Sequence, residues 1–375
     1  MVNTVKAQHI KQNNYNSIYQ LFFSYSQLSK PQIANLLGLS LPTVLNNMAE
    51  LERENKIKEN GVLVSQGGRP ATAYQLVNDA FIAIGVEIQQ KRIKLVALDL
   101  NANPIKLEKK TLQYQHTQTY LEELSQMINT FIEALGYEKM QILGIGISVQ
   151  GIVGRDSKSL LYSKILNFEH FNIETLQCML DYPIHLFHDV KCAARMELWK
   201  NQDLDNAFYL SISEHLGGAF ILNNQIEKGK NSFSGALEHL QIHHDGKSCY
   251  CGQRGCLEAY CSLSALLHDN EKLSDFFSKL RQSDPQTTER WQQFLRYLAK
   301  GLNAVYLIIE RDIVLGGDIA RYLCREDIVY LEQEVRKLYP FPLQDNFIKI
   351  ANLRDNVTVQ GAALPFIANY LAQLQ

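Results

Sequence analysis

The chain has 375 residues, of which 46% are hydrophobic and 20% charged, and its formal net charge is −2 at pH 7. This length allows two or three domains and a sizeable core without disulfide staples. The first residues contain no basic-then-apolar signal segment and no apolar run approaches the roughly 18 residues of a membrane span, so we expect a cytoplasmic protein with no membrane partner.

Two helix-start signals lie close together in residues 26–55. Ser29 and Gln32 form a capping box, Ser40 begins a second cap, and a proline follows each serine within two residues. Gly38 stands where the chain would turn between the two helices. This spacing predicts a helix-turn-helix.

The second of these helices, expected over residues 41–54, has an apolar face and a polar face. Helical spacing predicts that its core side consists of Leu45, Met48 and Leu51. The polar residues expected to face outward are Thr43, Asn46, Asn47 and Glu50. Asn and Thr can contact base edges in a major groove, so we predict that double-stranded DNA is bound by Thr43, Asn46 and Asn47. The alternative is a solvated face, and the small excess of basic residues over 1–80 is only a weak footprint for nucleic acid.

Residues 56–77 alternate in polarity and contain Gly-rich turns, which predicts a hairpin wing. Its tip reads Gly-Gly-Arg-Pro, so Arg69 is presented on a flexible pair of glycines and followed by a rigid residue. An arginine presented in this way can enter a narrow A·T-rich minor groove. We therefore predict that Arg69 contacts DNA, with a plain linker as the alternative.

After Asn78 the sequence alternates between strand-like and helix-like segments. Strands are expected at 81–100, 141–154, 184–189, 207–223 and 312–319, with helices at 118–136 and over much of 258–308. Such alternation predicts an α/β body with a ligand cleft at the strand ends.

Three of the seven cysteines lie within eight positions, in the sequence CYCGQRGC. Cys249, Cys251 and Cys256 can converge on one ion, and His239 would supply a fourth ligand; His243 and His244 are rival candidates in a solvated turn. Three thiolates and one imidazole leave no open position, so we expect structural Zn²⁺. The other four cysteines read as small buried hydrophobic residues.

From about residue 12 onward the chain resembles transcriptional regulators of the ROK family (repressor, open reading frame, kinase). The motifs that carry the resemblance are GGRPA, IGVEIQQKRIKLVALDL, GIGISVQG, HDVKCAA, the cysteine pattern, GCLEAY and VLGGDIA. The resemblance implies a winged helix-turn-helix at 1–78 and a two-lobed actin-like body of the sugar-kinase, ribonuclease H type. The lobes would span 79–200 and 201–375, with the C-terminal helix returning to the first, in a homodimer or homotetramer.

Kinases of this family read roughly DIGGT in the first phosphate loop, where this chain has Glu87, Gln89, Gln90 and Lys91 at the changed positions. Glycines there let backbone N–H groups approach phosphate, and glutamines fill that space. In the second loop Glu214 stands where kinases have a threonine, and a carboxylate repels phosphate. We therefore predict no catalytic residues and no enzymatic activity.

The resemblance also implies a sugar effector bound by Asp189, His239, Glu258 and His188. Asp189 would accept a hydrogen bond from a sugar hydroxyl, and His239 would join zinc to the sugar. The family motif GExGH reads GALEH here, so Ala236 replaces a sugar-binding glutamate and Glu238 replaces a glycine. The effector could thus be a modified sugar, and a vestigial cleft is the alternative.

Together these features predict a repressor of carbohydrate-metabolism genes that binds a palindromic operator. The alternatives are an active sugar kinase with a DNA-binding appendage and a repressor controlled by a protein partner.

Overall fold

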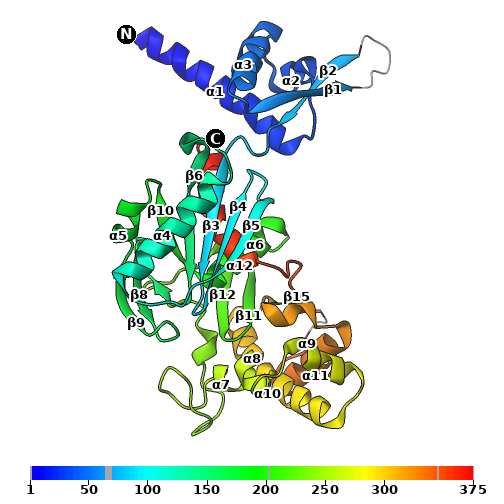
Figure 1. Ribbon diagram of the computed structural model, residues 1–375. Helices are drawn as coiled ribbons and strands as arrows, with labels where there is room; N and C mark the ends of the chain where they lie inside the picture. Colours follow the sequence, from blue (N-terminus) through cyan, green and yellow to red (C-terminus); the bar gives the residue numbers. More distant parts are fainter. Residues whose placement is uncertain (1, 64–69, 202, 344–345, 375) are drawn as a thin grey trace.

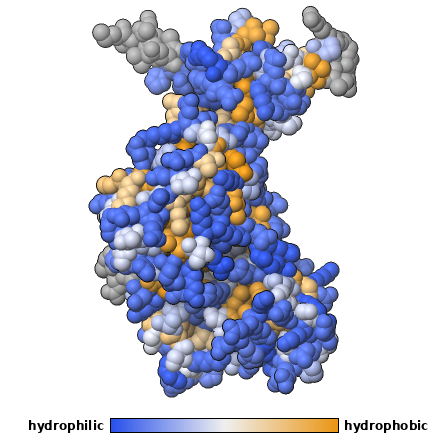
Figure 2. Space-filling view, viewed as in Figure 1, coloured by the Kyte–Doolittle hydropathy of each residue, from blue (hydrophilic) through white to orange (hydrophobic). Residues whose placement is uncertain are grey.

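The structure is a computed structural model that describes residues 2–63, 70–201, 203–343 and 346–374. A small N-terminal unit stands at one end of a larger α/β body, and the C-terminus lies near their junction (Figure 1). Hydrophilic side chains cover most of the face shown in Figure 2, with hydrophobic residues in small groups between them. In the described part of the chain, no helix combines the length and apolar character needed to cross a bilayer.

The N-terminal unit has three helices followed by an antiparallel hairpin. Its elements are α1 (Val2–Ser24), α2 (Lys30–Leu37), α3 (Leu41–Arg53), β1 (Ile57–Leu63) and β2 (Ala71–Leu76). The backbone N–H of Ser29 donates to the side chain of Gln32 at 2.9 Å, which forms the predicted capping box. Gly38 ends α2 in the left-handed region at φ 63°, and Ser40 caps α3. The local sequence signals therefore fix both helix starts and the turn between them.

The body contains two five-stranded sheets with the same connectivity. The first has the order β10-β6-β3-β4-β5 and the second β13-β12-β11-β14-β15. In each sheet the first three strands in chain order pair antiparallel and the next two add in parallel. The first sheet consists of β3 (Ile82–Ile88), β4 (Arg92–Leu98), β5 (Pro104–Thr111), β6 (Ile142–Val149) and β10 (Ile184–His188). The second consists of β11 (Ala207–Ile212), β12 (Leu216–Leu222), β13 (Gln225–Ile226), β14 (Asp312–Gly316) and β15 (Ile348–Ile350).

Two helices, α6 (Asp189–Lys200) and α12 (Val357–Ala372), connect the two halves of the body. One side of α6 packs with residues of β11, β12 and β14, while α12 packs against β3, β6 and α6. Glycines make these contacts possible, because a Cβ at Gly146 would overlap the carbonyl of Ala362 and one at Gly361 would overlap that of Cys192. The C-terminal helix is thus fitted closely against the first sheet.

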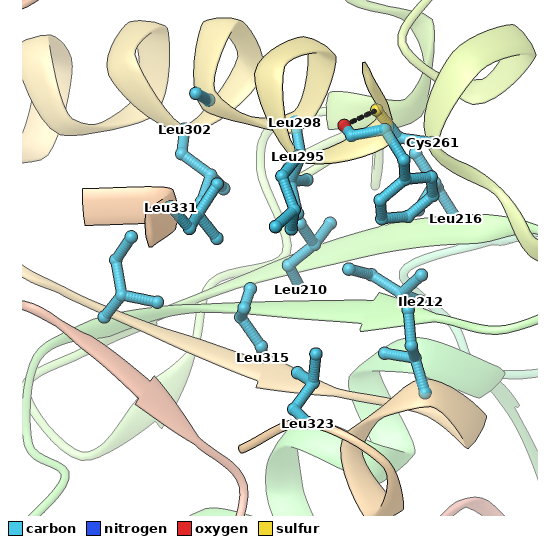
Figure 3. Close-up of a cluster of buried hydrophobic side chains, with 14 of the residues drawn as sticks. Leu210, Ile212, Leu216, Cys261, Leu295, Leu298, Leu302, Leu315, Leu323 and Leu331 are labelled. Carbon is cyan, nitrogen blue, oxygen red and sulfur yellow. Dashed lines mark hydrogen bonds between the residues drawn. The ribbon is translucent and has the colours of Figure 1, made fainter. Parts of the chain in front are cut away.

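Helices cover the outer faces of both sheets. On the first sheet they are α4 (Gln118–Glu133) and α5 (Glu174–Met179), next to a small sheet of β7 (Ile152–Val153), β8 (Ser159–Ser163) and β9 (Phe168–Asn172). On the second they include α7 (Glu258–Cys261), α8 (Leu263–Leu266), α9 (Leu273–Arg281), α10 (Pro285–Ile309) and α11 (Arg325–Leu338). Leucines from α10 meet Leu210 and Leu315 of the second sheet (Figure 3). Each half therefore has its own core and can hold its strand ends in place.

Candidate functional site

The exposed face of α3 differs from the sequence prediction at two residues. Thr43 is half-buried and Asn46 is exposed, but Asn47 is only 3% exposed and its Nδ2 donates to the carbonyl of Thr43 at 2.7 Å. Leu45, which was expected in the core, is 42% exposed. The prediction of Asn47 as a DNA contact and of Leu45 as a core residue is therefore wrong.

The cause is the phase of the helix. The buried stripe of α3 consists of Val44, Asn47, Met48 and Leu51, because these residues recur at three- and four-residue intervals from the helix start. Consecutive residues of a helix point about 100° apart around its axis. A core face that includes Val44 instead of Leu45 therefore places Asn47 on the buried side. Arg69 lies outside the described residues.

The four predicted metal ligands come together in the structure. One donor atom each from His239, Cys249, Cys251 and Cys256 lies within 4.8 Å of all the others. The Sγ atoms of Cys251 and Cys256 are 3.8 Å apart, and Nδ1 of His239 is 3.8 Å from the Sγ of Cys249. Thiolates 2.3 Å from a tetrahedral Zn²⁺ would lie about 3.8 Å apart, so this donor set fits zinc.

Tight turns and a backbone hydrogen bond hold this cluster together. Gly252 and Gly255 have φ values of 90° and 79°, which side-chain-bearing residues rarely adopt. The N–H of Leu257 donates to the carbonyl of Leu240 at 2.8 Å, which holds the cysteine loop beside the segment that carries His239. The rival His243 uses Nδ1 in a 2.8 Å contact with the carbonyl of its neighbour. Neither rival histidine belongs to the cluster of described ligands.

A cavity of about 410 Å³ lies next to this cluster, where strands of both sheets end. That volume lies within the range of small-molecule sites, and strand ends are the usual place for them in α/β folds. Its walls include three of the four predicted effector residues, His188, Asp189 and His239. The structure therefore brings the metal cluster and these residues to one cavity.

Asp189 is the first residue of α6, and its Oδ1 accepts the N–H of Val190 at 2.8 Å. Burial raises the pKa of Asp189 to about 6, although this hydrogen bond opposes the rise. Burial, aided by the charge of Lys191, lowers the pKa of the neighbouring His188 to about 4. At neutral pH the pair is thus a carboxylate beside a neutral imidazole, which suits hydrogen bonding to hydroxyl groups.

Glu258 does not line the cavity, contrary to the predicted direct contact. Glu258 is only 4% exposed. One of its carboxylate oxygens lies 2.8 Å from Nδ1 of His215, and the other accepts a hydrogen bond from the N–H of Leu216 at 2.7 Å. His215 lines the cavity instead. Burial lowers the pKa of His215, but the hydrogen bond and charge of Glu258 and the charges of Glu214 and Asp189 raise it above its ordinary value. Glu258 therefore positions an imidazole at the wall.

Two of the residues predicted to replace phosphate-loop residues, Gln89 and Glu214, line the cavity. Gln89 lines the cavity and its Nε2 donates to Glu87 at 2.5 Å, while Lys94 pairs with the other carboxylate oxygen of Glu87 at 3.1 Å. Glu214 lines the same cavity. The surviving glycines have packing reasons, because a Cβ at Gly317 would overlap the backbone of β11. At Gln89 and Glu214 the cavity wall is thus formed by side chains, and one of them is acidic.

Among the wall residues that the sequence analysis did not assign to a site are Tyr250, His215 and Asn356. Tyr250 places its ring 5.2 Å from that of His215 and 5.3 Å from that of His239, measured between centroids. Its position between two metal-binding cysteines was a usable signal. His215 lies in the segment that resembles the second phosphate loop, but its place at the wall depends on the tertiary fold, as does that of Asn356, which precedes α12 with φ 53°.

Comparisons with known proteins agree with this architecture. The sequence model of the ROK family matches residues 83–368 of this chain. The xylose repressor of Bacillus subtilis (strain 168) is 27% identical over 310 residues, which is 79% of each chain. A ROK family transcriptional regulator, homologous to the Escherichia coli Mlc protein, has a TM-score of 0.75 at 23% identity over 98% of each chain. A ROK family glucokinase of Streptomyces griseus, in complex with glucose and AMPPNP, has a TM-score of 0.65 at 18% identity, over 76% of this chain and 98% of its own. The body thus has a mixed α/β fold of the sugar-kinase type.

Proposed function

Because this chain belongs to the ROK family, we propose that it is a sugar-responsive transcriptional repressor that binds double-stranded DNA through α3. The observation that carries the proposal is the combination in one chain of a helix-turn-helix and a sugar-kinase-type cavity whose phosphate positions hold Gln89 and Glu214. The relative with the xylose repressor name supports the same function.

A sugar would bind beside the metal cluster. Asp189 would accept a hydrogen bond from one hydroxyl, and His215 and His239 would present ring nitrogens to others. Zn²⁺ held by His239, Cys249, Cys251 and Cys256 would fix the ring of His239 and supply no open coordination position. The role of the metal is therefore structural, and the chain's own side chains select the ligand.

A sugar kinase with a DNA-binding appendage is the rival function, because kinases share the fold. The crowded phosphate positions argue against it. The decisive experiment measures binding to DNA from the gene's own upstream region, with and without a panel of sugars, and assays the same sugars for ATP consumption. A sugar that alters operator affinity without ATP use supports the repressor. Steady ATP turnover with any sugar would establish the kinase, and an effect of cell extract alone would indicate a protein partner.

We expect a homodimer or larger assembly to read a palindromic operator, and Asn46 to contact a base edge. Asn46→Ala should weaken operator binding about tenfold, because one good amide-to-base pair is worth about 1–3 kcal/mol. Fluorescence anisotropy across a salt series measures this effect. Asn352→Ala, which removes an exposed amide from the body, is the matched control. Equal affinity for the wild type and Asn46→Ala would exclude this contact.

The C-terminal helix offers a path from the cavity to the DNA-binding unit. Asn356, Val357 and Thr358 at the start of α12 line the cavity. At its other end, Tyr370 packs on the core of the N-terminal unit and meets the ring of Phe81 at a tilt of 39°, with centroids 4.8 Å apart. A ligand that shifts the start of α12 would therefore change the contacts that Tyr370 makes with the DNA-binding unit, and with them the orientation of that unit.

Tyr370→Ala should leave sugar binding intact but remove the effect of the sugar on operator affinity. We expect the dissociation constant for the sugar to change by less than about threefold, whereas the sugar's effect on operator affinity should largely disappear, since typical coupling energies are about 1–3 kcal/mol. Calorimetry and anisotropy on the same preparations give the two numbers. Asn369→Ala, at the exposed neighbouring position on α12, controls for the helix end. An unchanged ratio of operator affinities in Tyr370→Ala would rule out this path.

A further inference from the structure

The helix α3 presents apolar side chains to the outside as well as to the core. Its outer face consists of Pro42, Leu45, Asn46 and Ala49, which are all exposed and follow the three- and four-residue spacing of one helix face. Leu45 is 42% exposed, and Asn46 is the only polar residue among the four. The opposite side of the helix packs in the core of the N-terminal unit. This outer face is therefore exposed although most of it is apolar.

Exposed apolar residues need an explanation when they gather on one surface. A single exposed leucine is ordinary in a globular protein. On the outer face of α3, however, three apolar residues lie together within a helix of 13 residues, and Leu41 at its first position is also 45% exposed. The solvent side of an amphipathic helix normally carries polar and charged residues. The outer face of α3 therefore has the composition of a contact surface.

The charge of the surrounding chain indicates which partner fits this surface. Residues 1–49 contain three lysines but no aspartate and no glutamate, so α2 and most of α3 lie in an acid-free stretch. The first acidic residue, Glu50, is half-buried and pairs with Lys11 at 3.0 Å. Arg53, one turn beyond Ala49, is exposed. A neutral to basic surface of this kind favours a polyanion such as DNA over an acidic or a purely apolar partner.

Thymine supplies the apolar group that such a face can recognise. The base pairs differ in the major groove by their hydrogen-bond donors and acceptors, and among the four standard bases thymine alone adds a methyl group at C5. This methyl group is recognised by burial against an apolar side chain. In a helix-turn-helix the N-terminal part of the second helix contacts base edges. Pro42, Leu45 and Asn46 lie in the first two turns of α3, which places them at that position.

We propose that the outer face of α3 reads thymine methyl groups and that Leu45 is its specificity-determining residue. Ala49 extends the apolar contact, and Asn46 on the same face supplies the hydrogen bond to a neighbouring base edge. This inference rests on the proposed function, since it names the base that the repressor reads through α3. It also gives a reason why Leu45 lies outside the core. The operator half-site should therefore carry thymines where it faces this helix.

Removal of the thymine methyl groups tests the contact on the natural DNA. The gene's own upstream region is amplified once with dTTP and once with dUTP, which gives two fragments that differ only in C5 methyl groups. Full-length, zinc-loaded protein should bind the uracil fragment about tenfold more weakly. Loss of one buried methyl group weakens binding about fourfold, and a palindrome presents each contact twice. Fluorescence anisotropy measures both affinities, with an unrelated fragment of equal length as the reference.

Equal affinity for the thymine and uracil fragments would overturn the inference but leave the repressor proposal intact. Binding to the thymine fragment no tighter than to the unrelated fragment would overturn the repressor proposal together with the inference. The two failures are therefore distinguishable in one assay.

Substitutions separate methyl contact from changes in the shape of the DNA. Leu45→Ala should weaken binding to the thymine fragment about tenfold but to the uracil fragment less than about threefold, because the methyl partner is already absent there. Leu45→Met keeps an apolar contact and should retain the preference for thymine. Leu338→Ala, which truncates a leucine of 45% exposure on α11, should change neither affinity. Equal loss on both fragments in Leu45→Ala would assign Leu45 to another contact, such as one with a second copy of the chain, and would overturn the inference.

Discussion

Cys251→Ser should lose the bound zinc and unfold the segment around it. Cys251 supplies one of four ligands, and its thiol lies 3.8 Å from that of Cys256. Binding of structural zinc contributes directly to folding, with apparent values of about 10–16 kcal/mol in small peptides. In a chain with its own cores we expect a loss of roughly 4 kcal/mol or more in the free energy of unfolding. Metal analysis by mass spectrometry and urea unfolding measure both effects.

Cys178→Ser is the matched control, because Cys178 lies outside the cluster and, contrary to the expectation that it is buried, is exposed. It should keep one zinc per chain and wild-type stability. The zinc-free variant should also lose sugar binding, since His239 reaches the cavity from the same cluster. One zinc per chain in Cys251→Ser would refute the ligand set.

Gly361→Ala should destabilise the protein although alanine favours helices. Replacing glycine by alanine inside a helix normally adds up to about 1 kcal/mol of stability. At Gly361, however, the new Cβ would overlap the carbonyl of Cys192 on α6, and backbone atoms cannot move aside cheaply. We expect a net loss of about 2–3 kcal/mol. Thermal and urea unfolding of the full-length chain give the sign and size.

Ala368→Gly on the exposed side of α12 is the companion variant. It should cost only the propensity difference of about 1 kcal/mol. The comparison separates helix propensity from the close crossing of α6 and α12. A Gly361→Ala variant more stable than the wild type would show that the two helices can move apart without cost.

Features fixed by nearby residues could be predicted from the sequence. Ser29 and Gln32 cap the start of α2, and Gly38 ends it. Each of these residues acts on backbone groups a few positions away, so both ends of α2 followed from local chemistry. The cysteine loop is similarly local, and only His239 comes from a separate segment. The phase of α3 could not be fixed from its residues, because apolar residues lie on more than one side of the helix. A core face that includes Leu45 and one that includes Val44 and Asn47 therefore both fit the pattern.

Features that depend on tertiary packing escaped the sequence interpretation. Glu258 follows the last cysteine and its place in the chain suggested a direct contact, but the fold inserts His215 between it and the cavity. The close approach of Gly361 to α6 likewise joins residues 169 positions apart, counted from Cys192 to Gly361.

The junction between the two parts of the molecule is built around a lysine. The Nζ of Lys56 lies 5.1, 5.7 and 5.6 Å from the ring centroids of Tyr15, Tyr19 and Phe81. Attraction between a cation and a ring face varies slowly with angle, unlike the fixed fork of an arginine–carboxylate pair. Tyr15 and Tyr19 lie in the N-terminal unit, where Glu54 also holds Lys56 at 2.8 Å, whereas Phe81 belongs to the body. We therefore expect the Lys56–Phe81 contact to persist through small changes in the tilt of the N-terminal unit.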